Sequence, residues 1–167
     1  MKIIIVTPAG RRRYLKILFK YLKKQKNDFK EWHLWENSRN NEDKEYILSL
    51  EKEYDWTGII AEPLPIWHFD LHKNRNCIIE NRCLWSKSGE ILEFLDVKES
   101  EYSTIKMYQN TDQHSIKRKK SKIINVETIS LFDLLKFHNA PEIIDYMSVD
   151  TEGSELEILL NFPFEHF

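Results

Sequence analysis

Short apolar runs alternate along this chain with segments in which apolar side chains recur at helical spacing. The runs are rich in β-branched and aromatic residues, which is typical of buried strands. They predict strands at residues 2–6, 32–35, 58–61, 77–85, 91–95, 123–126 and 143–149. The helical spacing predicts helices at residues 11–25, 42–54, 66–75 and 130–138, and a last helix that Ser154 opens.

Two stretches between these elements have a distinct character. Ser88 and Gly89 form a turn signal, so residues 77–85 and 91–95 predict an antiparallel hairpin. Residues 99–122 are polar, contain few aliphatic side chains and end in a basic run, which predicts a loop or an insertion. The basic run can contact phosphates. It lacks interleaved aromatic residues and an accompanying recognition fold, however, so a solvated loop is the better interpretation.

The alternation of strands and helices predicts the fold class. Strand–helix–strand order favours a parallel sheet covered by helices. We therefore expect an α/β fold with a Rossmann-like, mostly parallel sheet and helices on both faces. The length of 167 residues fits one domain, and no internal repeat is visible.

Composition narrows the class of protein. The chain has 25 Lys and Arg against 27 Asp and Glu, and this formal charge of −2 favours neither a nucleic acid nor a membrane surface as a partner. Aromatic residues make up 13% of the chain, which excludes a disordered tail. The apolar run at residues 2–6 is too short for a signal peptide, and no run approaches the roughly 18 residues of a membrane span. We expect a soluble, cytoplasmic protein without a membrane span.

The cysteines and histidines give little sign of a metal or a disulfide. Cys77 and Cys83 fall in one predicted strand, roughly 20 Å apart, whereas a disulfide needs about 7 Å or less. Both are expected to be buried structural thiols. His68 and His72 are one helical turn apart, but this spacing alone is a weak metal signal. We expect no metal site.

Ligands of open α/β sheets bind beyond the carboxyl ends of the strands, which singles out residues 7–10, 62–63 and 150–153. Glu62, followed by Pro63, can accept the hydroxyls of a ribose, or it can be a helix cap or a surface acid. Asp150 and Glu152 can supply a general base or a metal ligand, or they can simply cap the last helix. Residues 11–13, all arginine, can clamp a diphosphate or begin a helix.

From about residue 46 onward, several stretches follow the order of a known family. They are residues 50–63, 81–86, 129–135 and 144–155, and the strongest is the last, which reads Ile-Asp-Tyr-Met-Ser-Val-Asp-Thr-Glu-Gly-Ser-Glu. This part of the chain resembles the FkbM-type methyltransferases, which use S-adenosylmethionine. No single stretch is specific, but together they are.

The resemblance implies S-adenosylmethionine as the cofactor and assigns roles to particular residues. Glu62, with Pro63 beside it, would hold the ribose. The adenine would be lined by Cys83, Leu84 and Trp85. Asp150 and Glu152 would face the methyl-transfer centre, where one of them acts as the general base for an attacking hydroxyl.

Two departures from the family pattern bear on activity. Family members carry a glycine-rich loop of the form D-x-G-A-N-x-G, whereas residues 32–41 of this chain contain no glycine. A bend at residues 36–41 would still be needed there, with Glu36 as a cofactor contact. Members also continue through further strands, so we expect the sheet to be incomplete at its C-terminal end. Both departures predict weak or absent catalysis.

The beginning of the chain resembles a different family. Residues 3–15 and 31–38 are similar to the opening of a GT-A-type glycosyltransferase, although no Asp-x-Asp metal motif follows them. The resemblance implies that the first strand end contacts the nucleotide of a sugar donor. We therefore expect a glycosyltransferase-like β-α-β opening at residues 1–45 and a truncated FkbM-like domain at residues 46–167, packed as one unit.

The expected function is O-methylation by an S-adenosylmethionine-dependent enzyme, with a small molecule, a sugar or a glycan-linked product as the acceptor. One alternative is a fragment of a nucleotide-sugar glycosyltransferase. Another is a non-enzymatic remnant of a fusion that associates with itself through an unfinished sheet edge.

Overall fold

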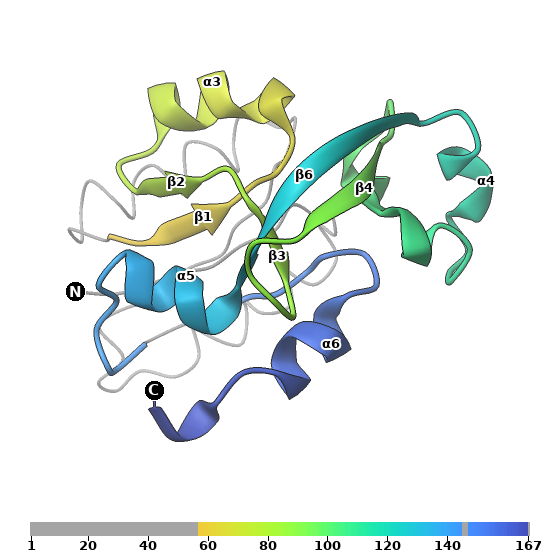
Figure 1. The fold of residues 1–167 in the computed structure, drawn as a ribbon. Helices are drawn as coiled ribbons and strands as arrows, with labels where there is room; N and C mark the ends of the chain where they lie inside the picture. Colours follow the sequence, from red (N-terminus) through yellow and green to blue (C-terminus); the bar gives the residue numbers. More distant parts are fainter. Residues whose placement is uncertain (1–56, 145–146, 167) are drawn as a thin grey trace, which may run out of the picture.

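The computed structural model describes residues 57–144 and 147–166 of the chain (Figure 1). The elements predicted at residues 2–6, 11–25, 32–35 and 42–54 lie outside this part, as do Glu36 and residues 7–13. The described elements are β1 (Ile59–Ala61), α3 (Pro65–Asn74), β2 (Ile78–Glu80), β3 (Cys83–Trp85), β4 (Ile91–Asp96), η1 (Ser100–Tyr102), β5 (Thr104–Ile105), η2 (Lys106–Tyr108), α4 (Ser115–Arg118), β6 (Lys122–Ser130), α5 (Leu131–Phe137), α6 (Glu155–Leu160) and η3 (Phe164–His166).

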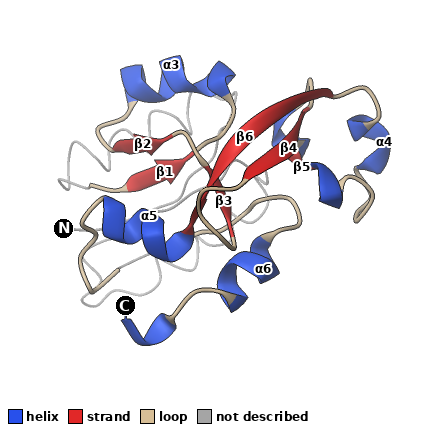
Figure 2. Ribbon diagram, in the orientation of Figure 1, coloured by secondary structure: helices blue, strands red, loops and turns tan. Residues whose placement is uncertain are grey.

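The first sheet is a parallel pair of short strands. Ile59 of β1 lies opposite Ile78 of β2, and Ala61 lies opposite Glu80. Parallel neighbours need a crossover connection, which α3 supplies (Figure 2). A proline at the start of α3 suits the first turn of a helix, where its missing N–H is not needed. The strand predicted at residues 58–61 and the helix predicted at residues 66–75 are confirmed.

The second sheet has four strands in the order β3-β6-β4-β5. Strand β6 pairs with two neighbours in succession. Its residues 128–130 run parallel to β3, and its residues 122–127 run antiparallel to β4. Asp96 at the end of β4 lies opposite Lys122 at the start of β6. The result is a curled, mixed sheet that reaches from the parallel pair toward α4 (Figure 1).

The prediction of one strand at residues 77–85 is wrong. The chain leaves the parallel pair after Glu80 and joins the other sheet at Cys83. Oε1 of Glu80 accepts the backbone N–H of Arg82 at 3.0 Å, so this amide is used locally rather than in a strand ladder. The predicted hairpin with residues 91–95 is also wrong, because β4 finds its antiparallel partners in β6 and β5.

The buried strand predicted at residues 143–149 is also wrong where the structure describes it. Residues 143–144 and 147–149 have irregular backbone, and Ile143 is 77% exposed. Ile144, Met147 and Val149 nevertheless pack against the core. The apolar pattern therefore indicates packing against the core, and not pairing with a neighbouring strand. Together with the antiparallel β4, this makes the described fold mixed α/β and not the expected Rossmann-like, mostly parallel sheet.

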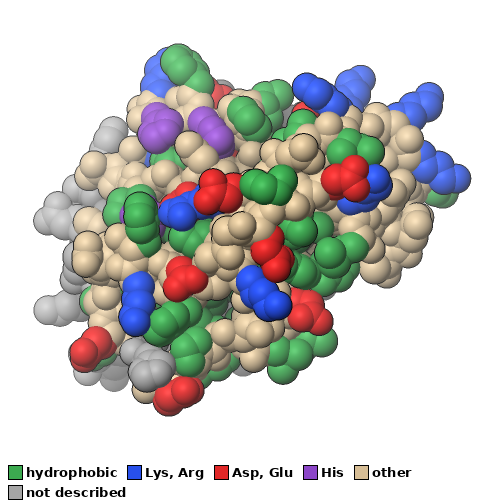
Figure 3. All heavy atoms as spheres, in the orientation of Figure 1, with side chains coloured by type: hydrophobic (Ala, Val, Ile, Leu, Met, Phe, Trp, Pro, Cys, Tyr) green, Lys and Arg blue, Asp and Glu red, His purple; other side chains and the backbone are tan. Residues whose placement is uncertain are grey.

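Residues 99–122 are more ordered than a solvated loop. They contain η1, β5, η2 and α4, and the side chain of Arg118 is completely buried. The neighbouring Lys117, Lys119, Lys120 and Lys122 are exposed, as expected, and basic side chains gather at the end of the molecule where α4 lies (Figure 3). The expectation of a solvated basic run thus holds for these lysines and fails for Arg118.

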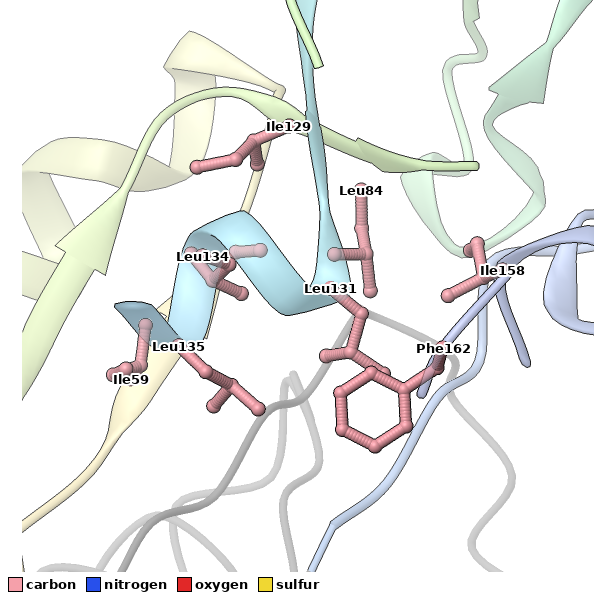
Figure 4. Packing of buried hydrophobic residues seen from close by; sticks show 9 residues of the cluster. Ile59, Leu84, Ile129, Leu131, Leu134, Leu135, Ile158 and Phe162 are labelled. Atoms are coloured by element: carbon pink, nitrogen blue, oxygen red, sulfur yellow. The ribbon is translucent and has the colours of Figure 1, made fainter. Parts of the chain in front are cut away.

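The main core lies where α5 and α6 meet the strands (Figure 4). It consists of Ile59, Ala61, Leu84, Ile129, Leu131, Leu134, Leu135, Ile158 and Phe162. The predicted helix at residues 130–138 is confirmed, and Ser130 caps it by accepting the backbone N–H of Asp133 at 3.1 Å. The last helix, α6, follows Ser154 as predicted.

A second buried cluster joins the end of β1 to the curled sheet. It contains Leu64, Cys83, Trp85, Phe94, Ile105 and Val126. Strands β3 and β5 form the edges of this sheet within the described residues, so self-association through an edge stays a prediction. In the described part of the chain, no helix combines the length and the apolar character that crossing a bilayer requires.

Candidate functional site

Glu62 follows β1 directly and is only 2% exposed. Its backbone N–H donates to the carbonyl of Glu80 at 2.9 Å, which extends the parallel ladder by one step. Its own carbonyl accepts a hydrogen bond from Nε2 of His68 at 2.7 Å. The backbone of Glu62 is thus fixed at the carboxyl end of a strand, which is one of the positions expected from the sequence.

The carboxyl group of Glu62 has an unusual acidity. Burial raises its pKa from 4.5 to about 8, because a charged carboxylate loses its hydration there. The backbone N–H of Leu64 donates to Oε1 at 2.8 Å and acts in the opposite direction, but burial dominates. Near neutral pH the group therefore keeps its proton and can both donate and accept a hydrogen bond.

A small hollow lies against Glu62. It is lined by Glu62, Pro63, Leu64, Cys83, Leu84, Phe94, Ser103, Ile105, Asp150, Thr151 and Ser154. Among these are five residues that the sequence analysis proposed for cofactor binding or catalysis: Glu62, Pro63, Cys83, Leu84 and Asp150. The volume of the hollow is about 20 Å³, which is room for a single water molecule.

The walls of the hollow come from distant parts of the chain. The ends of β1 and β3 supply Glu62, Cys83 and Leu84, while the polar segment 99–122 supplies Ser103 and Ile105. The sequence analysis missed these two residues, because it interpreted their segment as a loop. Both residues stand in a short polar stretch, Tyr-Ser-Thr-Ile-Lys, whose pattern gave no signal of burial.

Cys83 contributes an inert thiol. It is 4% exposed, and burial together with the nearby charge of Glu62 raises its pKa to about 12. An uncharged sulfur of this kind behaves as a small apolar group. Neither Cys83 nor Cys77 forms a disulfide, and Cys77 is only half-buried, so the expectation of a buried thiol fails for Cys77. The expectation of a buried thiol is confirmed for Cys83.

Trp85 and Glu152 lie away from the described lining of the hollow. The indole N–H of Trp85 donates to Oε2 of Glu90 at 3.0 Å, and the ring stands edge-on to Tyr108, with 6.2 Å between the ring centroids. Glu152 is buried and forms an ion pair with Arg118 at 3.1 Å. Arg118 was not proposed from the sequence, where it is hidden among exposed lysines.

A second, larger hollow of about 370 Å³ lies at the other end of the parallel pair. It is lined by Thr57, Gly58, Ile59, Arg75, Asn76, Cys77, Ile78 and His138. Because ligands of α/β proteins bind at the carboxyl ends of the strands, we favour the smaller hollow as the functional site. Among the described residues, no group of three His, Cys, Asp or Glu side chains is arranged to hold a metal ion.

Comparison with protein families shows to which family the chain belongs. The profile described as the methyltransferase FkbM domain matches residues 36–166, which is most of the sequence. The chain belongs to the FkbM methyltransferase family. The match to the FkbM domain begins before the boundary expected at residue 46 and includes Glu36 and residues 36–41 of the segment without glycine.

The other comparisons add no closer relative. No curated protein and no solved structure gave a significant match. No comparison supports a glycosyltransferase-like opening at residues 1–45, and part of that stretch falls within the FkbM match. Membership of the FkbM family implies methylation that depends on S-adenosylmethionine.

The donors around the small hollow fit the chemistry of S-adenosylmethionine. A buried carboxyl group stands ready for ribose hydroxyls, and Cys83, Leu84 and Phe94 offer apolar surface of the kind that an adenine requires. The volume of about 20 Å³ is far smaller than a nucleoside, so a cofactor would fit here only if the walls separated.

Proposed function

We propose that this FkbM-family chain is an S-adenosylmethionine-dependent O-methyltransferase. The observation that carries the proposal is the buried Glu62 at the end of β1, beside a hollow that Asp150 also lines. The proposed acceptor is a hydroxyl of a sugar or of a glycan-linked product.

Glu62 is proposed to hold the ribose. Its carboxyl group has one oxygen engaged by the N–H of Leu64, which fixes the side chain and leaves the second oxygen for a ligand hydroxyl. With a pKa of about 8, raised by burial, the group is neutral near pH 7 and can donate its own proton to one ribose oxygen. Pro63 stiffens the backbone that follows.

Leu84 and Cys83 are proposed to line the adenine. Both are almost completely buried on β3, and the thiol of Cys83 stays uncharged because burial raises its pKa to about 12. Phe94 and Ile105 add apolar surface from the curled sheet. Trp85, which was expected in this role, packs against Tyr108 instead.

Asp150 is proposed to be the general base. The chemistry that bound S-adenosylmethionine supplies is a methyl group on a positively charged sulfur. A hydroxyl that attacks this methyl must lose its proton, and a carboxylate beside the hollow can accept it. Glu152 was the other candidate, but its carboxylate is held by Arg118. We therefore favour Asp150.

Titration with S-adenosylhomocysteine tests the cofactor site without knowledge of the acceptor. We expect binding in the micromolar range to the wild-type chain and a loss of about tenfold or more in Glu62→Ala. Glu142→Gln removes an exposed carboxylate and is the matched control, with unchanged affinity expected. Circular dichroism of each variant checks that it is folded.

Methyl transfer tests the base. With radiolabelled S-adenosylmethionine and a panel of monosaccharides and glycans, Asp150→Asn should abolish transfer and leave the affinity for S-adenosylhomocysteine within about twofold. A folded wild-type chain that binds no S-adenosylhomocysteine would overturn the proposal. Equal transfer by Asp150→Asn would remove Asp150 from the mechanism and leave the cofactor site standing.

A further inference from the structure

Arg118 is a charged side chain with no exposed surface. A guanidinium can be buried only when its donors and its charge are matched. Its Nε donates to the carbonyl of Tyr102 at 2.8 Å, and its Nη1 and Nη2 reach the two carboxylate oxygens of Asp112 at 2.7 and 2.9 Å. Nη2 also donates to Oε2 of Glu152 at 3.1 Å.

The contact with Glu152 is the only one of these that leaves the polar segment 99–122. It joins α4 to the turn at residues 150–153, which precedes α6. The backbone of this turn is unusual. Glu152 has a φ of 56° and Gly153 a φ of 128°, and a residue with a side chain seldom adopts the left-handed region. Such a conformation persists when its surroundings hold it.

The same segment holds the turn at further points. The hydroxyl of Thr104 donates to the carbonyl of Glu152 at 3.0 Å. The ring of Tyr108 lies so close to Gly153 that a Cβ there would stand 3.1 Å from its atoms. On the other side, the carboxylate of Glu155 accepts the N–H of Thr151 at 2.6 Å. The turn is thus clamped between the segment and α6.

The polar segment and the turn that it holds both contribute residues to the lining of the small hollow. Ser103 and Ile105 belong to the segment, and Asp150 and Thr151 lead into the turn. Arg118 does not touch the hollow itself; its ion pair with Glu152 joins the two pieces of chain that form one of its walls. This ion pair therefore connects Arg118, which lies outside the site, to the turn that contains Asp150.

We propose that Arg118 is a positioning residue, which acts through Glu152 to hold the turn at residues 150–153 and so places Asp150 against the cofactor hollow. This inference rests on the proposed function. In this proposal Glu152 links the turn to Arg118 of the polar segment, and Asp150 remains the proposed general base.

Three variants separate positioning from general stability. Arg118→Met removes the charge and keeps an unbranched side chain, and Arg118→Lys keeps the charge but loses the fork of donors. The double variant Arg118→Met/Glu152→Gln removes both members of the pair. It guards against a misfolded single variant, in which the carboxylate of Glu152 would be left buried without its partner. Lys106→Met is the matched control, because it breaks an exposed ion pair with Glu93 in the same segment.

Amide hydrogen exchange gives a readout that does not depend on any ligand. In Arg118→Met the amides of Thr151 and Gly153 should exchange about tenfold faster or more, while those of β1 keep their wild-type protection. Lys106→Met should change neither. Uniform acceleration across β1 and the turn would show a purely structural role and would overturn the proposal.

Titration with S-adenosylhomocysteine gives the second readout. Loss of the turn would also displace Thr151, which lines the hollow and which Asp150→Asn leaves in place. We therefore expect about tenfold weaker binding in Arg118→Met, partial recovery in Arg118→Lys, and coupling between the two substitutions in the double variant. Wild-type affinity in a folded Arg118→Met chain would overturn the positioning role. If the wild-type chain binds no S-adenosylhomocysteine, the proposed function fails and the link to a cofactor fails with it. The exchange data then decide separately whether Arg118 holds the turn.

Discussion

The backbone N–H of Leu64 donates to Oε1 of Glu62 at 2.8 Å, across two positions of the chain where β1 ends. This hydrogen bond fixes a buried carboxyl group beside the hollow. It does not offset the free energy that is lost when the charged carboxylate is removed from water. The pKa of Glu62 accordingly rises to about 8. Folding and protonation are therefore coupled at this residue.

The coupling predicts how stability depends on pH. Because the pKa is higher in the folded chain than in the unfolded one, the folded state binds the proton more tightly. The contribution to stability is complete below pH 4.5 and is lost as the pH rises through about 8, with an upper limit of about 5 kcal/mol. Urea unfolding between pH 5 and 9 measures it. Glu62→Gln should flatten this part of the profile, and an unchanged slope in that variant would contradict the assignment.

Gly153 and Gly89 form a natural pair for testing the turn beside the hollow. Both have positive φ, but only Gly153 has a neighbour, Tyr108, where a Cβ would stand. Gly89→Ala should cost about 1 kcal/mol through backbone strain alone. Gly153→Ala should cost about 3 kcal/mol, because contact with the ring of Tyr108 adds to the strain. Thermal unfolding of both variants gives the comparison, and equal losses would mean that the ring moves aside freely.

Glu80 holds the point where the chain passes from one sheet to the other. Burial works to raise its pKa, but hydrogen bonds from Arg82 and His138 outweigh burial and lower the pKa to about 2. The stability that the lowered pKa of Glu80 contributes is present above pH 4.5 and is lost as the pH falls through about 2. Glu80→Gln should lower the stability at pH 7 by about 2 kcal/mol and flatten the acid part of the profile. Glu142→Gln, at an exposed site, should leave both unchanged.

The two cysteines should differ in reactivity. Burial and the charge of Glu62 raise the pKa of Cys83 to about 12, so almost no thiolate exists there at pH 8. We expect iodoacetamide to modify Cys83 on the order of 100-fold more slowly in the folded chain than in urea. Mass spectrometry of the two cysteine peptides measures this, with the half-buried Cys77 as the internal reference. Rapid modification of Cys83 in the folded chain would show that the hollow is open.

The elements that the sequence predicted well are those with local causes. Helix α5 has apolar side chains at helical spacing and begins behind Ser130, whose hydroxyl caps it. Helix α3 begins at a proline, and β1 ends just before Glu62 and Pro63. Each of these signals lies within a few residues of the element that it specifies, so one sequence suffices to recognise it.

Strand pairing has non-local causes, and there the predictions failed. Ile144, Met147 and Val149 pack against the core, but packing against a core does not require a neighbouring strand. The break after Glu80 depends on a carboxylate that satisfies the amide of Arg82, which no hydrophobic pattern reveals. The parallel partner of β3 is β6, far along the chain.

The candidate site shows the same division. Glu62 follows a strand and could be proposed from its position, whereas Cys83 and Leu84 were proposed only through the resemblance to the FkbM family. Ser103 and Ile105 reach the hollow only because β5 pairs with β4, which the sequence did not predict. Asp150 lines the hollow although residues 143–144 and 147–149 form no strand before it, and its catalytic role stays a prediction.

Asp96 and Lys122 face each other across the ladder of β4 and β6, so the chain leaves this sheet and returns to it at the same rung. Most of the chain from η1 to α4 is therefore a detour between two adjacent points, within which β5 pairs with the other edge of β4. Closing a detour of another length costs little, because the entropy of loop closure grows only with the logarithm of length. An exchanged detour would bring a new wall to the hollow in place of Ser103 and Ile105, while Glu62 stays fixed to β1. Replacement of this one segment would thus change the lining of the hollow, while the pairing of β4 with β6 stays the same.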